Sequence, residues 1–296
     1  MGAPGLDFET WDSKSANLSR PLLEIQMYNL ADLESALAST IYSGELHYAP
    51  TTASTNSDAL AAARNSAQHG SVYFADEQTA GRGRGDHAWH SAAGEGLYVS
   101  VLLRPQLPAA RLSLLPLVAG LAAAAAIHEV TGLAPAPGLD IDLRWPNDLL
   151  IGSRKAGGIL VEARNDSKGL LDAVAVVVGI GINVHQREFP ADLATPATSL
   201  DVETGRRISR QSLLVALLKS LERETCVLSA PDAAKAVLDR VESASTWIRG
   251  RRVQVHGPQT CQGVTAGLDE NGFLLVETAT GVVTVQTGGL RAAEKD

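Results

Sequence analysis

The segment 171–184, LDAVAVVVGIGINV, constrains the fold of this chain most strongly, because it begins as an unbroken apolar run rich in valine. Such a run is typical of a central strand that is buried on both faces of a sheet. The sequence therefore predicts a mixed α/β domain of the α+β class around this strand.

The remaining pattern divides the chain into an N-terminal extension (1–45), the α/β domain (46–246) and a C-terminal β domain (247–296). Predicted helices cover 29–40, 55–68 (closed by Gly70), 111–131, 209–225 and 231–243, and predicted strands cover 71–76, 96–103, 141–145 and a hairpin that turns at 152–154. After Trp247, short alternating strands separated by turns such as 269–272 predict a small β-barrel.

Composition limits the classes of function. The chain has 296 residues, 45% of them hydrophobic, and a net charge of −8, which disfavours sequence-independent binding to nucleic acid. Cys226 and Cys261 lie far apart and outside any zinc pattern, so we expect no disulfide scaffold and a reducing compartment. The N-terminus shows no secretory signal, and the apolar run 112–127 is short for a membrane span. We expect a cytoplasmic protein with a buried helix there and no membrane partner.

A glycine-rich loop, residues 76–96 (DEQTAGRGRGDHAWHSAAGEG), lies between two predicted strands. Arg82 and Arg84 are suited to an anion, and the glycines allow backbone N–H groups to approach a phosphate closely. It is not a Walker A motif. Long irregular loops inside compact domains are usually functional, which favours a binding role over a flexible surface loop or a basic nucleic-acid patch.

Two further clusters accompany predicted element ends. In ASTN (53–56) the polar side chains favour a helix cap, with hydrogen bonding to a neutral ligand group as the alternative. In RWPND (144–148), Pro146 ends a strand and leaves Asn147 and Asp148 at its carboxyl end, where ligands of α/β sheets gather. Asp148 could hold Mg²⁺ through water, or the segment could be an ordinary turn.

Glycines mark the last two clusters. In RKAGGILVE (154–162), Lys155 opens a strand beside Gly157 and Gly158, and glycine inside a strand often marks the close approach of a ligand. In GIGIN (179–183), glycines leave room at the end of the buried strand, toward which Asn183 is expected to point. A solvated lysine and a simple strand-ending turn are the alternatives.

Taken in order, STN, QTAGRGR, W, RWPND, RKAGGILVE and GIGINV resemble the biotin protein ligases over residues 47–190, and TGGLR (287–291) extends the resemblance weakly. The resemblance implies the catalytic fold shared with class II aminoacyl-tRNA synthetases, followed by an SH3-like domain. It implies activation of biotin by ATP and Mg²⁺ to biotinyl-5′-AMP, and transfer to a lysine of a biotin carboxyl carrier protein domain. Because 1–45 is short for a DNA-binding domain, we expect the monofunctional type, with a homodimer left open.

The resemblance also implies the site residues. The biotin-binding set is Ser54, Thr55, Asn56, Gln78, Gly81, Arg82, Gly83, Arg84, Lys155, Gly157 and Gly158. The nucleotide-binding set is Arg84, Trp89, Asn147, Asp148, Lys155, Asn183 and Arg291. Lys155 and Arg84 are the catalytic pair, Asp148 is the magnesium position, and the glycine-rich loop is a lid over the adenylate.

The chain departs from the family pattern at two places. Gly85, Asp86 and His87 stand where many members carry further basic residues, which puts retention of the adenylate in doubt, and the short TGGLR motif does the same for Arg291. Three other functions stay open: a lipoate or octanoate transferase, a nucleic-acid-binding module, and a biotin sensor without transferase activity.

Overall fold

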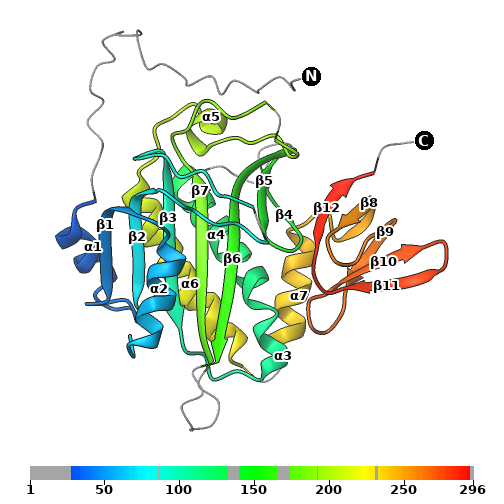
Figure 1. Cartoon of the computed structure of the whole chain (residues 1–296), viewed down its shortest axis with the longest axis horizontal. Helices are drawn as coiled ribbons and strands as arrows, with labels where there is room; N and C mark the ends of the chain where they lie inside the picture. Colours follow the sequence, from blue (N-terminus) through cyan, green and yellow to red (C-terminus); the bar gives the residue numbers. More distant parts are fainter. Residues whose placement is uncertain are drawn as a thin grey trace, which may run out of the picture.

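The structure is a computed structural model that describes residues 28–85, 87–132, 140–165, 174–191, 193–230 and 233–293. Within this part, a large sheet with helices on both faces is followed by a small β domain (Figure 1). The strands of the large sheet are β1 (Leu46–Thr52), β2 (Val72–Gln78), β3 (Gly96–Leu103), β4 (Ile141–Arg144), β5 (Asp148–Ile151), β6 (Arg154–Asn165) and β7 (Val174–Asn183). Their order is β1-β2-β3-β7-β6-β5-β4, with β1 and β2 parallel and the other pairs antiparallel.

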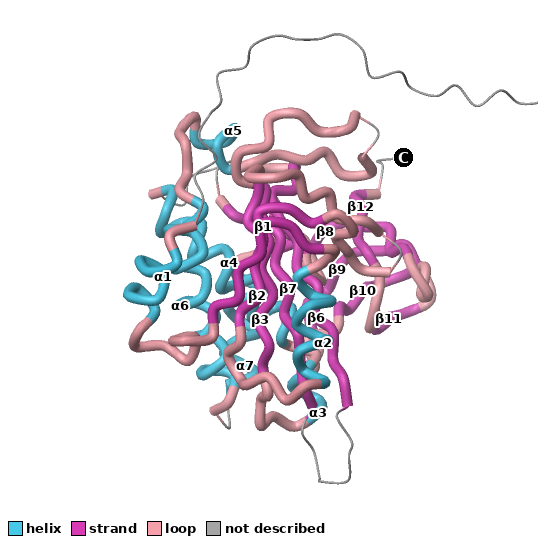
Figure 2. The backbone as a smooth tube through the Cα atoms, turned by 60° about the vertical axis from the view of Figure 1, so that its left-hand side comes forward, coloured by secondary structure: helices cyan, strands magenta, loops and turns pink. Residues whose placement is uncertain are grey.

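The central strand β7 is buried on both faces, as its apolar run predicts. Helix α2 (Thr55–Arg64) covers one face, and α4 (Leu115–Thr131) and α6 (Arg210–Leu228) cover the other (Figure 2). Successive side chains of β7 enter different clusters: Ala175 and Val177 pack with Ala59 and Ala63 of α2, whereas Val176 and Val178 join the main core. This alternation follows from the two-residue period of a strand.

Helix α4 confirms the expectation of a buried helix. Together with the short α3 (Ala109–Leu112) it is long and apolar enough to cross a membrane, but most of it is buried inside the protein. Its closest helical neighbour is α6, and Ala119, Gly120 and Ala123 are among its buried small residues. It is therefore the core helix of this domain.

Residues 28–45 are packed onto the α/β domain. Helix α1 (Leu30–Leu37) is capped by the Asn29 side chain, which accepts hydrogen bonds from the backbone N–H groups of residues 31 and 32. Leu33 and Leu37 are fully buried in the main core, and the backbone N–H of Asn29 donates to Gln211 of α6 at 2.7 Å.

The C-terminal unit is an antiparallel sheet that follows α7 (Ala233–Ser243). Its strands are β8 (Arg249–His256), β9 (Cys261–Leu268), β10 (Leu274–Thr278), β11 (Gly281–Val285) and β12 (Gly289–Ala292), in the order β11-β10-β9-β8-β12. The indole Nε1 of Trp145 donates to the carbonyl of Gly272 at 3.0 Å, and Ser113 Oγ donates to the carbonyl of Asn271 at 2.7 Å. These bonds fix the small domain against the large one.

Three elements differ from the sequence expectation. Helix α2 ends at Arg64, because Asn65 leaves the helical conformation and Ser66 has a φ of 64°, so Gly70 does not close it. Strand β1 and the short helix α5 (Leu200–Thr204) were not predicted. The predicted opening of α7 at 231–232 lies outside the described residues.

Candidate active site

A cavity of about 700 Å³ lies where the large sheet, the glycine-rich loop and the C-terminal domain meet. Fourteen of the sixteen predicted site residues line it: Ser54, Thr55, Asn56, Gln78, Arg82, Gly83, Arg84, Trp89, Asn147, Asp148, Lys155, Gly158, Asn183 and Arg291. Its permanent charges, among the described residues, are the cations Arg82, Arg84, Arg144, Lys155 and Arg291 and the single acid Asp148. A chain of net charge −8 thus contains a locally basic cavity, which suits an anionic ligand.

The glycine-rich loop forms an irregular hairpin over this cavity. The backbone N–H of Trp89 donates to the carbonyl of Gly81 at 2.9 Å, and that of Gly83 donates to His87 at 2.7 Å. A Cβ at Gly81 would lie 2.4 Å from the carbonyl oxygen of Trp89, so this position needs glycine for packing although it does not line the cavity. Asp86 lies outside the described residues, and the expectation about its charge stays a prediction.

Glycines of β6 and β7 make room for the side chains that face them. A Cβ at Gly181 would lie 2.6 Å from the indole of Trp89, and one at Gly158 would lie 3.3 Å from both Trp89 and Lys155. Gly157 faces the other way, 2.9 Å from Leu149, and does not line the cavity. The glycines therefore let two large side chains lie flat against the sheet.

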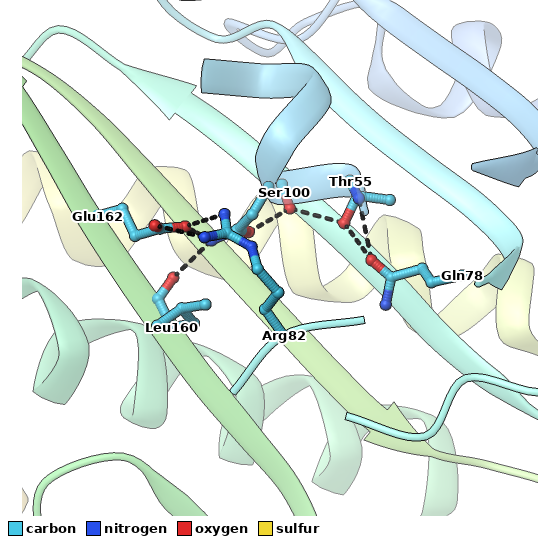
Figure 3. Close-up of polar contacts among 7 residues, drawn as sticks. Thr55, Gln78, Arg82, Ser100, Leu160 and Glu162 are labelled. Carbon is cyan, nitrogen blue, oxygen red and sulfur yellow. Dashed lines mark hydrogen bonds and ion pairs between the residues drawn. The ribbon is translucent and has the colours of Figure 1, made fainter. Parts of the chain in front are cut away.

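The neutral side chains of Thr55, Asn56 and Gln78 form a polar wall of the cavity. They belong to a row of hydrogen bonds that continues to Ser100 and Glu162, which do not line it (Figure 3). The backbone N–H of Thr55 donates to Gln78 Oε1 at 2.9 Å, and Thr55 Oγ1 lies 2.8 Å from Ser100 Oγ. Ser100 Oγ donates to Asn56 Oδ1 at 2.5 Å, and Asn56 Nδ2 donates to Glu162 at 2.8 Å. This polar row can offer donors and acceptors to a ligand group without net charge.

The favoured cap interpretation of residues 53–56 is wrong. Ser54 is the N-cap of α2, but its side chain makes no capping hydrogen bond. The side chains of Thr55 and Asn56 instead bond to residues of β2, β3 and β6, because these strands bring stronger partners than the helix end. The alternative interpretation, hydrogen bonding toward a ligand, fits this arrangement.

Lys155, Asp148 and Arg144 form a charged cluster on the opposite side. Lys155 Nζ lies 2.6 Å from Asp148 Oδ1, and Arg144 Nη2 lies 2.6 Å from Asp148 Oδ2. Burial alone would raise the pKa of Asp148, but the charges of Lys155 and Arg144 outweigh burial and hold this pKa below its usual value. Lys155 Nζ also lies 5.4 Å from the ring centre of Trp89, in cation–π range.

The described residues do not fit a magnesium site built on Asp148. Each of its two oxygens already contacts a cationic side chain, and the described part of the chain has no group of three His, Cys, Asp or Glu residues suited to a metal. Mg²⁺ prefers several oxygen ligands and retains water, so it would depend chiefly on oxygens of a bound ligand.

The two predicted asparagines, Asn147 and Asn183, line the cavity and also donate hydrogen bonds to backbone carbonyl groups. Asn147 Nδ2 donates to the carbonyl of Ile159 at 2.8 Å, and Asn183 Nδ2 donates to the carbonyl of Thr198 at 3.0 Å. They therefore fix the ends of β5, β6 and β7 around the site. Their predicted contact with the nucleotide stays a prediction.

Two arginines connect the cavity to the C-terminal domain. Arg84 Nη1 donates to the carbonyl of Gly288 at 2.7 Å, and Nη2 donates to Thr287 Oγ1 at 2.8 Å. Burial lowers the pKa of Arg84, while Asp148 opposes that effect. Arg291 lies on β12 and lines the cavity from the C-terminal side.

Sequence reasoning missed three residues that shape the site: Ser100, Arg144 and Glu162. Ser100 is the one polar side chain in the apolar strand GLYVSVLL, and Glu162 ends the motif RKAGGILVE. Arg144 opens RWPND and lines the cavity. A buried polar residue in an apolar strand was the available signal for Ser100.

Comparison with known proteins places the chain in a protein family. Residues 48–183 match the Biotin/lipoate A/B protein ligase family. The bifunctional ligase/repressor BirA of Bacillus spizizenii is 32% identical over 263 residues, which cover 88% of this chain and 78% of that protein. The biotin–[acetyl-CoA-carboxylase] ligase of Mycobacterium tuberculosis is 32% identical over 240 residues, which cover 80% of this chain and 85% of the relative.

A solved structure supports the same relationship. The biotin protein ligase of Aquifex aeolicus in complex with biotin and ATP has a TM-score of 0.71 and 30% identity, over 84% of this chain and 99% of that chain. The chain therefore belongs to the Biotin/lipoate A/B protein ligase family. Within that family its relatives are biotin protein ligases, which confirms the resemblance carried by its motifs and the predicted fold with a small C-terminal β domain.

Proposed function

We propose that the protein is an ATP-dependent biotin ligase, which forms biotinyl-5′-AMP and transfers biotin to a lysine of a biotin carboxyl carrier protein domain. One observation carries the proposal: a single cavity joins a neutral polar wall to a cationic wall. Biotin has a neutral ureido ring at one end and a carboxylate at the other, and ATP adds a triphosphate. Relatives at 30% and 32% identity are named as biotin ligases, one of them solved with biotin and ATP.

In the first step, an oxygen of the biotin carboxylate attacks the α-phosphorus of ATP and pyrophosphate leaves. Both reactants are anions, so the encounter is electrostatically unfavourable. Lys155 and Arg84 line the cavity and offset this charge, and fixing both reactants in line supplies much of the remaining rate enhancement. Any Mg²⁺ would be held chiefly by the triphosphate oxygens, because the described residues offer no ligand set for it, and would supply additional charge neutralisation. No protein nucleophile is needed.

In the second step, the amine of the carrier lysine attacks the carbonyl carbon of the adenylate, and AMP leaves. The adenylate is a mixed anhydride that water would hydrolyse. The described hairpin residues 82–85 and 87–90 line the cavity, and closure of the hairpin on the bound adenylate would exclude water. Its glycines allow the backbone to follow the ligand, and binding compensates for the entropy of ordering.

A lipoate or octanoate transferase fits the cavity less well. The head of lipoate or octanoate is apolar, so it would bury Thr55, Asn56 and Gln78 away from water without offering them any hydrogen bond. We further propose that the protein is cytoplasmic, which its two separate free cysteines support, and that it acts without nucleic acid, which its net charge of −8 supports. Homodimer formation, which occurs in the family that the motifs resemble, is a separate proposal. Light scattering of the protein with biotin and ATP would test it.

The decisive experiment mixes the purified protein with biotin, ATP and a purified carrier domain. We expect the carrier to gain the mass of one biotin, with release of pyrophosphate and AMP, and no gain when ATP is omitted. Modification with lipoate or octanoate in place of biotin would instead support a transferase for those acids. Biotin binding without pyrophosphate release would identify a sensor and contradict the proposal.

A further inference from the structure

Glu162 lies on β6 behind the residues that line the cavity and contacts two functional side chains at once (Figure 3). Its carboxylate accepts a hydrogen bond from Asn56 Nδ2 at 2.8 Å. It also forms a two-point ion pair with Arg82, at 3.0 Å and 2.7 Å. Asn56 belongs to the polar wall and Arg82 to the glycine-rich loop, so Glu162 joins the two parts of the site.

The carboxylate of Glu162, at 2.8 Å, and the backbone carbonyl of Leu160, at a longer 3.4 Å, determine how the amide of Asn56 is oriented. A carboxylate can only accept, so the amide must turn its NH₂ group toward Glu162 and its oxygen toward Ser100. Ser100 then donates its single hydroxyl proton to Asn56 Oδ1, so only Thr55 can donate across the 2.8 Å contact to Ser100, and it shares that proton with Gln78 Oε1 at 3.1 Å. The orientation of the Asn56 amide thereby sets the direction of the hydrogen bonds between Ser100 and Glu162.

The same row of bonds reaches both ends of the glycine-rich hairpin. At the entry, Arg82 is held by Glu162. At the exit, Gln78 Nε2 donates to Ser91 Oγ at 2.8 Å, and Ser91 Oγ donates to the carbonyl of Trp89 at 3.2 Å. Thr55 connects to Gln78, so the polar row is continuous from Glu162 to the exit of the hairpin.

We propose that Glu162 is a positioning residue for biotin binding: it orients the Asn56 amide in the polar wall and anchors the glycine-rich hairpin through Arg82. The inference rests on the proposed function and assigns Glu162 no contact with substrate. It gives the hairpin and the recognition wall a common support, so that the geometry that recognises biotin also holds the lid that retains the adenylate.

The test is Glu162→Gln, which keeps the shape of the side chain but removes its charge. A glutamine can donate as well as accept, so it no longer enforces the Asn56 orientation, which only the long contact with the Leu160 carbonyl then favours, and the two-point ion pair with Arg82 is lost. We expect the biotin KM to rise about tenfold, which corresponds to losing one charge-assisted hydrogen bond. The kcat for pyrophosphate release at saturating biotin should fall less than about threefold, because uniform binding alone is weakened. Escape of biotinyl-5′-AMP into solution should increase.

Glu242→Gln is the matched control. Glu242 also forms a two-point pair with an arginine, Arg249, and its side chain is 24% exposed compared with 26% for Glu162. It does not line the cavity, so its variant should retain the wild-type biotin KM. Equal KM values for Glu162→Gln and Glu242→Gln would overturn the proposal.

Arg82→Gln separates the two contacts of Glu162, because it removes the ion pair and leaves the hydrogen bond from Asn56 in place. It also serves as the test if Glu162→Gln does not fold. It should increase adenylate escape, and adding Glu162→Gln should raise the biotin KM further without further escape. Unchanged escape in Arg82→Gln, or fully additive escape in the double variant, would contradict the anchoring role. Calorimetric titration of the same proteins with biotin measures binding and does not depend on transfer. A wild-type protein that binds biotin without transferring it would refute the proposed function. The effect of Glu162→Gln on biotin affinity would still test this inference.

Discussion

Lys155 has two partners in the cavity, the carboxylate of Asp148 at 2.6 Å and the face of Trp89 at 5.4 Å. A substrate carboxylate or phosphate that enters must compete for the same ammonium group. Asp148 keeps its bond to Arg144 when Lys155 turns away, so the aspartate stays paired in either situation. The cost of freeing Lys155 is therefore lower than that of breaking an isolated buried pair.

We predict that Lys155→Ala lowers the rate of pyrophosphate release on the order of a hundredfold, the effect typical of removing one group that stabilises transition-state charge. The fold should be retained, because Arg144 still neutralises Asp148. The measurement is pyrophosphate release with saturating biotin and ATP, with thermal unfolding as the check on the fold. Lys235→Ala, which changes a lysine whose side chain is 83% exposed on α7, is the control. Unchanged pyrophosphate release in Lys155→Ala would contradict its role.

Single residues show clearly where sequence reasoning stops. Residues inside a motif, such as Gln78 and Lys155, could be placed at the cavity because the motif itself lies there. Ser100 and Glu162 could not, because their roles depend on partners 44 and 106 residues away, respectively, brought together by strand pairing. Position along the chain carries no information on that register, which the whole sheet determines.

At the scale of elements, β7 combines a strand core with a binding surface. Its first half is valine-rich and buried, whereas Gly179 and Gly181 at its end lie opposite Asn56 and Trp89. A Cβ at Gly179 would lie 1.9 Å from Asn56 Oδ1, and the Asn56 amide cannot move away without losing Ser100 or Glu162. The polar wall therefore requires glycine at position 179, because any side chain there would displace Asn56.

We predict that Gly179→Ala displaces Asn56 and destabilises the protein by about 1–3 kcal/mol, the usual result of overpacking. The biotin KM should rise at the same time, because the polar wall is displaced. Gly120→Ala in α4 is the control, since its nearest neighbour would lie at an ordinary 3.5 Å. Denaturant unfolding and biotin titration of both variants give the comparison, and a Gly179→Ala protein with wild-type biotin binding would contradict this reading of the strand.

Element prediction succeeded where local pattern and burial agree. Strand β3 was placed at its observed bounds, and β7 and α4 nearly so, because an apolar strand between turns and a long apolar helix are strong local signals. Strand β1 was missed because it is an edge strand with mixed burial and contains Pro50. Edge strands tolerate proline and polar residues, so their pattern resembles that of a loop.

At the scale of the whole molecule, the cavity is completed by two units that are far apart in sequence. The large sheet supplies the polar wall and Lys155, and the C-terminal domain supplies Arg291 and the turn that receives Arg84. Sequence predicted both units and, through Arg291, a C-terminal contribution to the site, but it did not predict the contact of Arg84 with Thr287, because these partners are separated by 203 residues. The hairpin of the glycine-rich loop thus bridges the two domains through one guanidinium group.

Thr287 tests whether this bridge retains the adenylate. Thr287→Val keeps the side-chain volume but removes the oxygen that accepts from Arg84 Nη2, while the bond from Nη1 to the carbonyl of Gly288 remains. We expect a wild-type rate of pyrophosphate release, because Lys155 and the polar wall are unchanged and the cavity lining loses only one hydroxyl group. Adenylate escape should increase about threefold, for the loss of one exposed hydrogen bond. Arg84→Gly removes both bonds and should release more adenylate, labelling bystander lysines. Thr280→Val, on the exposed β10–β11 turn, is the control and should behave as wild type.

The measurement is the amount of biotin attached to a non-carrier protein after incubation with biotin and ATP. If adenylate escapes from Arg84→Gly but not from Thr287→Val, then Arg84 acts on the ligand alone and not through the contact between the domains.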